Sequence, residues 1–287
     1  MKEKALKQRV KNQVILITGA TDGLGKQVAR DLAAQGATML LHGRSREKGE
    51  ATLQEIRDAT GNQKVIYYDA DFSSLDAVQR LTEKIQGDQV RLDVLINNAG
   101  IGAGSRQARR QISTDGYELR FAVNYLAPFL LTHQLLPLLC RSTPARIVNV
   151  ASVGQRPIDF NNVMLNDGYD GLRAYRQSKL ALIMFTFDLA EELSKSGVTV
   201  NSLHPATLMN TKMVLESDYF GGPMSTVEEG ARAVEYLAVS PEVDSVTGEY
   251  FYGNQRAHAN PQAYDKGARR KLWMLSEKLT RFKEPTD

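Results

Sequence analysis

Short apolar segments alternate with longer helical patterns along most of the chain, and this alternation restricts the possible folds more than any other feature. The apolar segments are nearly continuous, as expected for parallel strands that helices cover on both faces. We predict seven strands, at residues 14–17, 38–41, 64–68, 94–96, 146–150, 198–203 and 250–252. Helical patterns fill the intervals, at residues 24–35, 46–60, 74–86, 114–139, 174–196 and 226–239.

A repeat of strand and helix predicts one doubly wound α/β domain with a mainly parallel sheet, because right-handed crossovers join its parallel strands. The chain has 287 residues, of which 42% are hydrophobic, and this is enough for one large core. We expect a basic N-terminal extension over residues 1–12 and a single domain over residues 13–287.

Charge and composition exclude several kinds of protein. The 36 basic residues nearly balance the 33 acidic ones, so we expect no nucleic-acid partner. No apolar run reaches the roughly 18 residues that a transmembrane segment needs. Cys140 is the only cysteine, which favours a reducing, cytoplasmic location. The four histidines show no metal-ligand spacing, so we expect no metal site.

The first strand leads directly into a glycine-rich segment and then into a helix, which is the context of a dinucleotide phosphate cradle in a Rossmann-type domain. In such a cradle Gly19 permits a tight turn, Gly23 lets the backbone approach a pyrophosphate, and Gly25 removes a side chain where helix packs on strand. The helix N-terminus adds unpaired N–H groups. The cofactor contacts expected here are Gly19, Thr21, Asp22, Gly23, Leu24 and Gly25.

The end of the second strand indicates which dinucleotide binds. An NAD-binding domain usually presents a carboxylate to the ribose 2′-hydroxyl about 20 residues beyond the cradle. Arg44, Ser45 and Arg46 stand there instead. Because arginine can bind a 2′-phosphate, we predict NADP(H), with NAD(H) as the alternative cofactor. The other interpretation is that both arginines are only surface residues at the start of a helix.

Tyr175 and Lys179 form the one Tyr-x-x-x-Lys pair among the 11 tyrosines. Residues four apart share a helix face, so the ammonium is expected beside the phenol. It would lower the phenol pKa from near 10 toward neutrality, where an acid/base catalyst works best. Ser152, just after the fifth strand, can hydrogen-bond a substrate oxygen, and Asn124 in the long helix completes the set. Taken singly, these two have ordinary interpretations as a strand-end cap and a polar helix residue.

Several motifs follow one another along the chain: the glycine segment, Asn97 to Gly100, Asn124, Ser152, the Tyr175 and Lys179 pair, and a His-Pro-Ala-Thr segment. In this order they resemble the short-chain dehydrogenase/reductase family, over residues 13 to about 255. The resemblance implies that Tyr175 is the general acid/base, that Lys179 also binds the nicotinamide ribose, and that Asn124 holds a water in a proton relay. It adds these expected cofactor contacts: Asp71, Phe72, Asn98, Ala99, Gly100, Pro205 and Thr211.

Three positions bear on this resemblance. Asp71 corresponds to a residue that accepts a hydrogen bond from the adenine amine, although a helix N-cap is an equal alternative. Asp22 stands where some NADP-dependent members have a second basic residue, which argues against NADP. Ala206 replaces a glycine that is common in the family's turn before Thr211.

The interval between Ser152 and Tyr175 and the C-terminal segment are similar to the retinol-dehydrogenase-like branch, whose animal members carry a membrane anchor that we do not expect here. An apolar, glycine-punctuated segment at about residues 206–225 predicts a mobile lid over an apolar substrate, or else a packed surface loop. A helix at about residues 265–282 has one apolar face, which predicts packing on the core or on a partner subunit. By family resemblance, the helices around Asn124 and Tyr175 could pair in a homodimer or homotetramer.

We therefore predict an NADP(H)-dependent oxidoreductase that transfers a hydride between nicotinamide and a carbonyl or alcohol, with an apolar or aromatic ketone, aldehyde or secondary alcohol as the substrate. One alternative is a catalytically silent NADP-sensing regulator, which would normally lack the Tyr and Lys pair. A second alternative is an NAD-preferring alcohol dehydrogenase. A third is an epimerase, although an epimerase would normally need a longer substrate domain.

Overall fold

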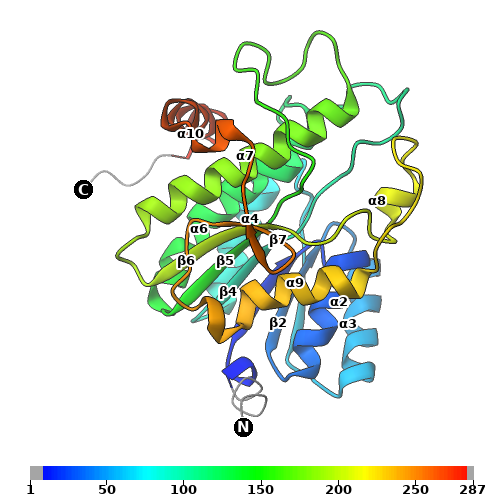
Figure 1. Ribbon diagram of the computed structural model, residues 1–287. Coiled ribbons are helices and arrows are strands. Elements are labelled where there is room, and N and C mark those ends of the chain that lie inside the picture. The colour runs from blue at the N-terminus through cyan, green and yellow to red at the C-terminus, as the bar shows by residue number, and fades with distance from the viewer. Residues whose placement is uncertain (1–8, 283–287) are drawn as a thin grey trace.

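Eight strands form one sheet in the order β3-β2-β1-β4-β5-β6-β7-β8, in a computed structural model that describes residues 9–282 (Figure 1). All neighbouring strands are parallel except β7 and β8, which are antiparallel. The strands are β1 (Val14–Thr18), β2 (Thr38–Gly43), β3 (Val65–Asp69), β4 (Val94–Asn97), β5 (Ala145–Val150), β6 (Val198–His204), β7 (Tyr250–Tyr252) and β8 (Gln255–Ala257).

Helices cover both faces of this sheet and bury a separate apolar core on each side. One core includes residues of α4, α6, α7 and α10, and the other includes residues of α2, α3 and α9. The longer helices are α2 (Gly23–Ala34), α3 (Arg46–Thr60), α4 (Leu75–Asp88), α6 (Ala127–Arg141), α7 (Gly171–Glu192), α9 (Val227–Val239) and α10 (Lys266–Thr280). Shorter helical turns are α5 (Leu119–Phe121), η1 (Ala122–Leu126), α8 (Lys212–Leu215), η2 (Pro241–Val243) and η3 (Pro261–Tyr264).

The seven predicted strands are all present, and the prediction is wrong only in missing an eighth, β8. This strand has the sequence Gln-Arg-Ala and lies at the edge of the sheet, where two of its three residues are exposed. A short edge strand needs no apolar pattern, because it pairs through its backbone alone. Gly253, with φ of 59°, permits the tight turn from β7 into β8.

The helix predicted from residue 114 begins at Leu119 and contains a π-helical turn. Glu118 caps its first turn, because a carboxylate oxygen accepts a hydrogen bond from the Phe121 amide at 2.7 Å. The π-helical turn η1 then separates α5 from α6 and includes Asn124. A π turn inserts one extra residue into a helix and has no composition of its own, so the sequence pattern does not reveal it.

By length and composition, the continuous helix Leu119–Arg141 could cross a membrane, with a mean hydropathy of 1.2. In the fold, however, 72% of its most apolar window is buried inside the domain. This is weak evidence for a membrane span, because the core helix of a water-soluble protein has the same properties.

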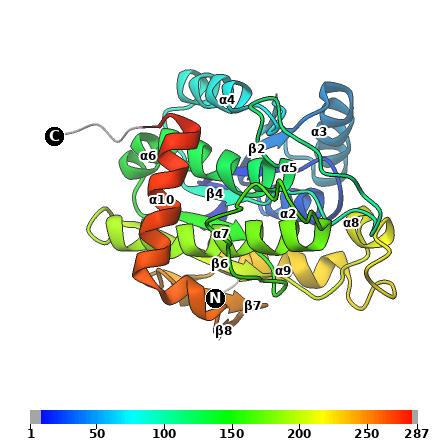
Figure 2. The same ribbon diagram turned by 90° about the horizontal axis from the view of Figure 1, so that it is seen from above.

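Helix α10 packs on the chain's own core, one of the two outcomes expected for it. Trp273 contacts Phe129 of α6 and Phe185 of α7, with ring centroids 5.4 and 6.0 Å apart, and Ser276 hydrogen-bonds Tyr125 at 2.6 Å. Figure 2 shows α10 crossing both helices. Because α10 covers part of α6 and α7, a partner subunit could use that part of their surface only by displacing α10.

We predict that Glu235 of α9 makes the stability of the fold depend on pH. Burial, and then the nearby Asp31 of α2, raise the pKa of Glu235 from 4.5 to about 8. The folded chain therefore binds this proton more tightly than the unfolded chain, and the free energy of unfolding falls as pH rises from about 4.5 to 8. Glu235→Gln should raise stability by roughly 2 kcal/mol at pH 9 and change it little at pH 4.

Thermal unfolding of both proteins across this pH range measures the effect. Glu50→Gln, the same change at an exposed site on α3, is the control and should have no such pH dependence. Parallel stability curves for wild type and Glu235→Gln would contradict the prediction.

Candidate active site

A cavity of about 480 Å³ lies where the carboxyl ends of the central strands meet, and it collects most of the residues predicted from the sequence. Such crevices at the ends of parallel strands are the usual ligand sites of doubly wound sheets. The predicted residues that line it are Gly19, Thr21, Asp22, Gly23, Leu24, Gly25, Asn98, Ala99, Gly100, Ser152, Tyr175, Lys179, Pro205 and Thr211. Asn124, Arg44, Asp71 and Phe72 are not in this lining.

The glycine cradle at the start of α2 has space only for backbone. Gly19 and Gly23 have positive φ angles of 68° and 49°. A Cβ atom on Gly25 would lie 2.2 Å from the Gly19 carbonyl oxygen, so a side chain there is sterically excluded. Asn98 stabilises this turn through two hydrogen bonds, because its Nδ2 donates to the Thr18 and Gly19 carbonyls at 2.8 and 3.2 Å. This bare backbone at a helix N-terminus fits the pyrophosphate of a nicotinamide dinucleotide.

Asp22 caps α2 and forms an ion pair with a cation from the lid. Its carboxylate accepts a hydrogen bond from the Gly23 amide at 2.8 Å, and Lys212 Nζ lies 2.6 Å from its other oxygen. The hydrogen bond from Lys212 is the main cause of the lowered pKa of Asp22. The structure therefore places a cation of α8 beside Asp22, a contact that the sequence pattern did not indicate.

Arg44 and Arg46 have different surroundings at the end of β2. Arg46 begins α3 and pairs with Asp69 at 3.4 Å, in agreement with the interpretation that it is a surface residue at the start of a helix. Arg44 is exposed and makes no side-chain hydrogen bond or ion pair within residues 9–282. Thr21 of the cradle packs over Gly43, since a Cβ atom there would lie 2.7 Å from Thr21 Cγ2. Arg44 therefore directly follows a residue in contact with the cradle.

Asp71 and Phe72 follow the carboxyl end of β3, which is parallel to the central strands and therefore ends at the same edge of the sheet as they do. Asp71 Oδ1 accepts a hydrogen bond from the Ser73 amide at 2.9 Å, whereas Ser74 is the residue that caps α4. The alternative that Asp71 is the helix N-cap is therefore wrong, and its contact with adenine stays a prediction. The Phe72 ring is buried and stacks on His42 at 4.2 Å. Only its backbone is then free to meet a cofactor.

Tyr175, Ser152 and Lys179 meet in the cavity, but the pKa of the phenol differs from expectation. Burial raises the pKa of Tyr175, and a hydrogen bond with the Ser152 side chain only partly opposes this shift. Lys179 Nζ donates to the Val150 carbonyl at 2.8 Å and lies 5.9 Å from the Tyr175 ring centre. The expectation that the ammonium lowers the phenol pKa is not met in this structure, because desolvation outweighs so distant a charge. Burial also lowers the pKa of Lys179 to about 8.

Asn124 lies behind the cavity wall and fixes a loop in front of it. Its Oδ1 accepts from the Ile101 amide at 2.8 Å, and its Nδ2 donates to the Ile101 carbonyl at 3.1 Å and to Ser178 Oγ at 3.0 Å. Both ends of the amide are therefore bonded to protein atoms. The expected role in holding a water stays a prediction.

The predicted lid at about residues 206–225 borders the cavity. Leu208, with φ of 47°, is the left-handed residue of the turn after Pro205, so alanine is tolerated at position 206. A backbone bridge between Met209 and Ser225 joins the two ends of the lid. Met213 lies against Gly102, where a Cβ atom would be 2.6 Å from Met213 Cγ, and the lid therefore contacts the opposite wall.

Sequence reasoning missed two further residues at the site. His204 lines the cavity and is 5% exposed, although the histidines were considered only as metal ligands. Its Nε2 bonds Thr207 Oγ1 at 3.1 Å, which in turn bonds the Tyr252 hydroxyl at 2.6 Å. Its position at the end of β6 was the available signal. Arg120, 4% exposed, binds the loop at Gly102 and had no signal in the sequence. No group of histidine, cysteine or carboxylate side chains suited to a metal occurs among the described residues.

Comparisons with known proteins agree with this geometry. The family model for short chain dehydrogenase matches residues 13–219. Human retinol dehydrogenase 13 is 35% identical, over 98% of this chain and 88% of the human protein. The crystal structure of an uncharacterized protein from Mycobacterium paratuberculosis has a TM-score of 0.78 and 30% identity, over 96% of both chains. A short chain dehydrogenase from Escherichia coli CFT073 complexed with NADPH has a TM-score of 0.70 and 28% identity, over 86% of this chain and 98% of that one.

The family match spans both the glycine cradle and the Tyr175 helix, the two parts of the cavity that differ most in chemistry. One part is suited to phosphates and the other to proton transfer. From the family match and the similarity to retinol dehydrogenase 13, we conclude that this chain belongs to the short-chain dehydrogenase family and is an oxidoreductase acting on CH–OH or C=O groups.

Proposed function

We propose that the protein uses NADP(H) to interconvert an apolar carbonyl compound and its alcohol. The observation that carries the proposal is that Ser152, Tyr175 and Lys179 line the same cavity as the glycine cradle. A silent nucleotide sensor has no need of a phenol, a hydroxyl and an ammonium gathered beside its cofactor cradle, and this set therefore favours catalysis over regulation.

In the proposed reaction the bound nicotinamide supplies or accepts the hydride, and the chain handles the proton. The raised pKa of Tyr175 keeps the phenol protonated at neutral pH, which is the form needed to protonate an alkoxide during reduction. Ser152, which lines the same cavity, would hydrogen-bond the same substrate oxygen. Lys179 Nζ lies 5.9 Å from the Tyr175 ring centre, is held by its bond to the Val150 carbonyl, and is suited to a ribose hydroxyl.

The lining of the cavity favours an apolar substrate. Its apolar side chains include Leu172 of α7 and four residues of the lid, Met209, Met213, Val214 and Phe220. Such a surface gains free energy by excluding water from hydrocarbon, whereas a highly charged metabolite would lose its hydration there. The likeness to a protein named retinol dehydrogenase 13 supports an apolar alcohol or aldehyde.

Two observations support NADP(H) as the preferred cofactor. Arg44 is an exposed guanidinium at the end of β2, where a 2′-phosphate would lie in a Rossmann-type site. A structural relative is complexed with NADPH. We also propose a reducing, cytoplasmic location, for which the single cysteine Cys140 is the support.

We expect Tyr175→Phe to lower kcat for carbonyl reduction by about 100-fold to 10,000-fold, because the proton donor is removed. NADPH binding, followed by fluorescence titration, should change less than threefold. In the wild type, reduction should decline at alkaline pH, as the phenol loses its proton. The assay is NADPH oxidation with a panel of apolar ketones and aldehydes. Tyr236→Phe, on α9 outside the cavity, is the control, and a Tyr175→Phe enzyme with more than a tenth of normal turnover would refute the role.

A second prediction concerns the choice of cofactor. Arg44→Asp should weaken NADPH binding by about 10-fold to 100-fold, because a charge-assisted contact is replaced by repulsion. NADH binding should be unchanged or tighter. Fluorescence titration of both cofactors measures the ratio, with Arg80→Asp on the exposed side of α4 as a charge-matched control. Equal binding of the two cofactors by the wild type would remove the basis for Arg44 as the determinant.

A further inference from the structure

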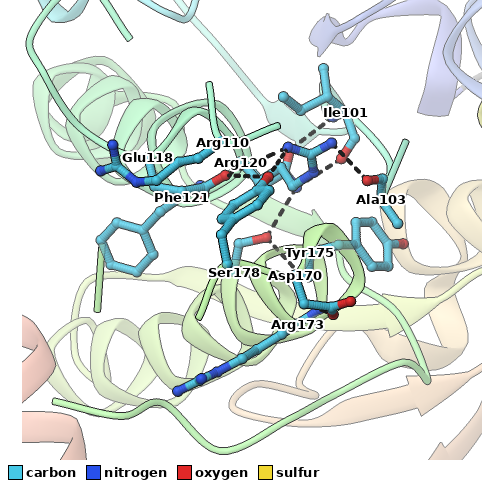
Figure 3. Close-up of polar contacts among 12 residues, drawn as sticks. Ile101, Ala103, Arg110, Glu118, Arg120, Phe121, Asp170, Arg173, Tyr175 and Ser178 are labelled. Atoms are coloured by element: carbon cyan, nitrogen blue, oxygen red, sulfur yellow. Dashed lines mark hydrogen bonds and ion pairs between the residues drawn. The ribbon is translucent and has the colours of Figure 1, made fainter. Parts of the chain in front are cut away.

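Arg120 is a buried arginine whose hydrogen bonds reach two loops, one of which lines the cavity. It lies on α5 and is 4% exposed. Its Nε donates to the Gly102 carbonyl at 2.8 Å, its Nη2 to the Ala103 carbonyl at 2.7 Å and its Nη1 to the Tyr169 hydroxyl at 2.5 Å. Glu118, fully buried, balances the charge at 3.6 Å. Figure 3 shows Arg120 with Ala103 on one side and Glu118 on the other.

The carbonyls that Arg120 binds belong to the wall of the cavity. Gly102 and Ala103 both line it, and Met213 of the lid packs against Gly102. One turn further along the same helix, Asn124 binds the amide and carbonyl of Ile101. Three consecutive residues, of which Gly102 and Ala103 line the cavity, are therefore fixed by two side chains from one helical segment.

The same wall contacts the helix that carries Tyr175. A Cβ atom on Gly171, the first residue of α7, would lie 2.3 Å from the Ala103 carbonyl oxygen, which is the oxygen that Arg120 Nη2 binds. Tyr175 is one helical turn beyond Gly171. Tyr169, the third partner of Arg120, lies just before this helix. Arg120 therefore bonds to both sides of the junction between the cavity wall and α7.

Stability alone is a weak reason for this arrangement. A buried ion pair loses hydration, and apolar residues of similar volume often stabilise a fold as well or better. What a guanidinium adds is a planar fork that binds several oxygens at fixed angles, which an ammonium cannot reproduce. The three oxygens come from two separate loops, so the fork sets the distance between them.

We propose that Arg120 is a positioning residue, which holds the substrate side of the cavity in register with Tyr175. The inference rests on the proposed function and extends it, since it assigns the placement of the carbonyl substrate to a residue outside the cavity. Arg120 has no hydrogen bond to the glycine cradle. Its loss should therefore affect the substrate and leave the cofactor almost untouched.

Arg120→Lys, which keeps the charge but loses the fork, provides the main test. We expect kcat/KM for an apolar aldehyde to fall by about 10-fold to 100-fold, because small displacements of reacting groups are costly. The dissociation constant for NADPH should change less than twofold. Hydrogen exchange at residues 100–104 and 169–175 should become faster. Arg173→Lys is the matched control, because Arg173 pairs with Asp159 at 3.2 Å and does not reach the cavity wall.

Two further variants keep the test decisive if Arg120→Lys folds poorly. Tyr169→Phe removes one partner of the fork and should lower kcat/KM severalfold with normal NADPH binding. Arg120→Ala should regain part of its activity when guanidinium ions are added at millimolar concentration, whereas Arg173→Ala should not respond.

Unchanged kcat/KM in Arg120→Lys, or an equal loss of NADPH affinity, would overturn the proposal. If the wild type reduces no compound in the carbonyl panel, the proposed function fails instead. Hydrogen exchange then decides the positioning role by itself, and unaltered exchange at residues 100–104 in Arg120→Lys would reject it.

Discussion

The parallel pairing of β1, β4, β5 and β6 is the constraint on which the rest of the structure depends. Asn97 pairs with Asn149 in register, and Val150 pairs with Leu203, so three strands end at nearly the same level. The register is reinforced inside the sheet, because Asn97 Nδ2 donates to Asn149 Oδ1 at 2.8 Å. The residues that follow these strands therefore reach one edge of the sheet, where the cavity lies.

Burial at this edge controls the acid/base properties of the site. It raises the pKa of Tyr175 and lowers that of Lys179 to about 8, and in both cases desolvation is the main cause. The two shifts favour the neutral form of each group, as a low-dielectric environment requires. At neutral pH Tyr175 is therefore a neutral phenol, and Lys179, with a pKa of about 8, still keeps its proton.

Polar contacts between segments distant in sequence convert this edge into a cavity with defined walls. Arg120 and Asn124 fix the wall after β4, and the lid lies across from it, tied to the cradle by the pair of Lys212 with Asp22. Arg106 also stacks on Tyr219 of the lid, with its guanidinium carbon 5.1 Å from the ring centre. In each of these contacts the two residues lie far apart in the sequence. The shape of the cavity therefore depends on long-range contacts.

The sequence by itself determined the strand and helix order, the glycine cradle, and the Tyr175 and Lys179 pair, because each of these follows from local patterns or fixed spacings. Only the tertiary structure decided the π turn at Asn124, the edge strand β8, and the roles of Arg120 and Lys212, whose partners lie in distant segments. It also reversed the expected direction of the Tyr175 pKa shift. A helical spacing predicts which residues are neighbours, but desolvation depends on everything that surrounds a group, and this is known only when the chain is folded.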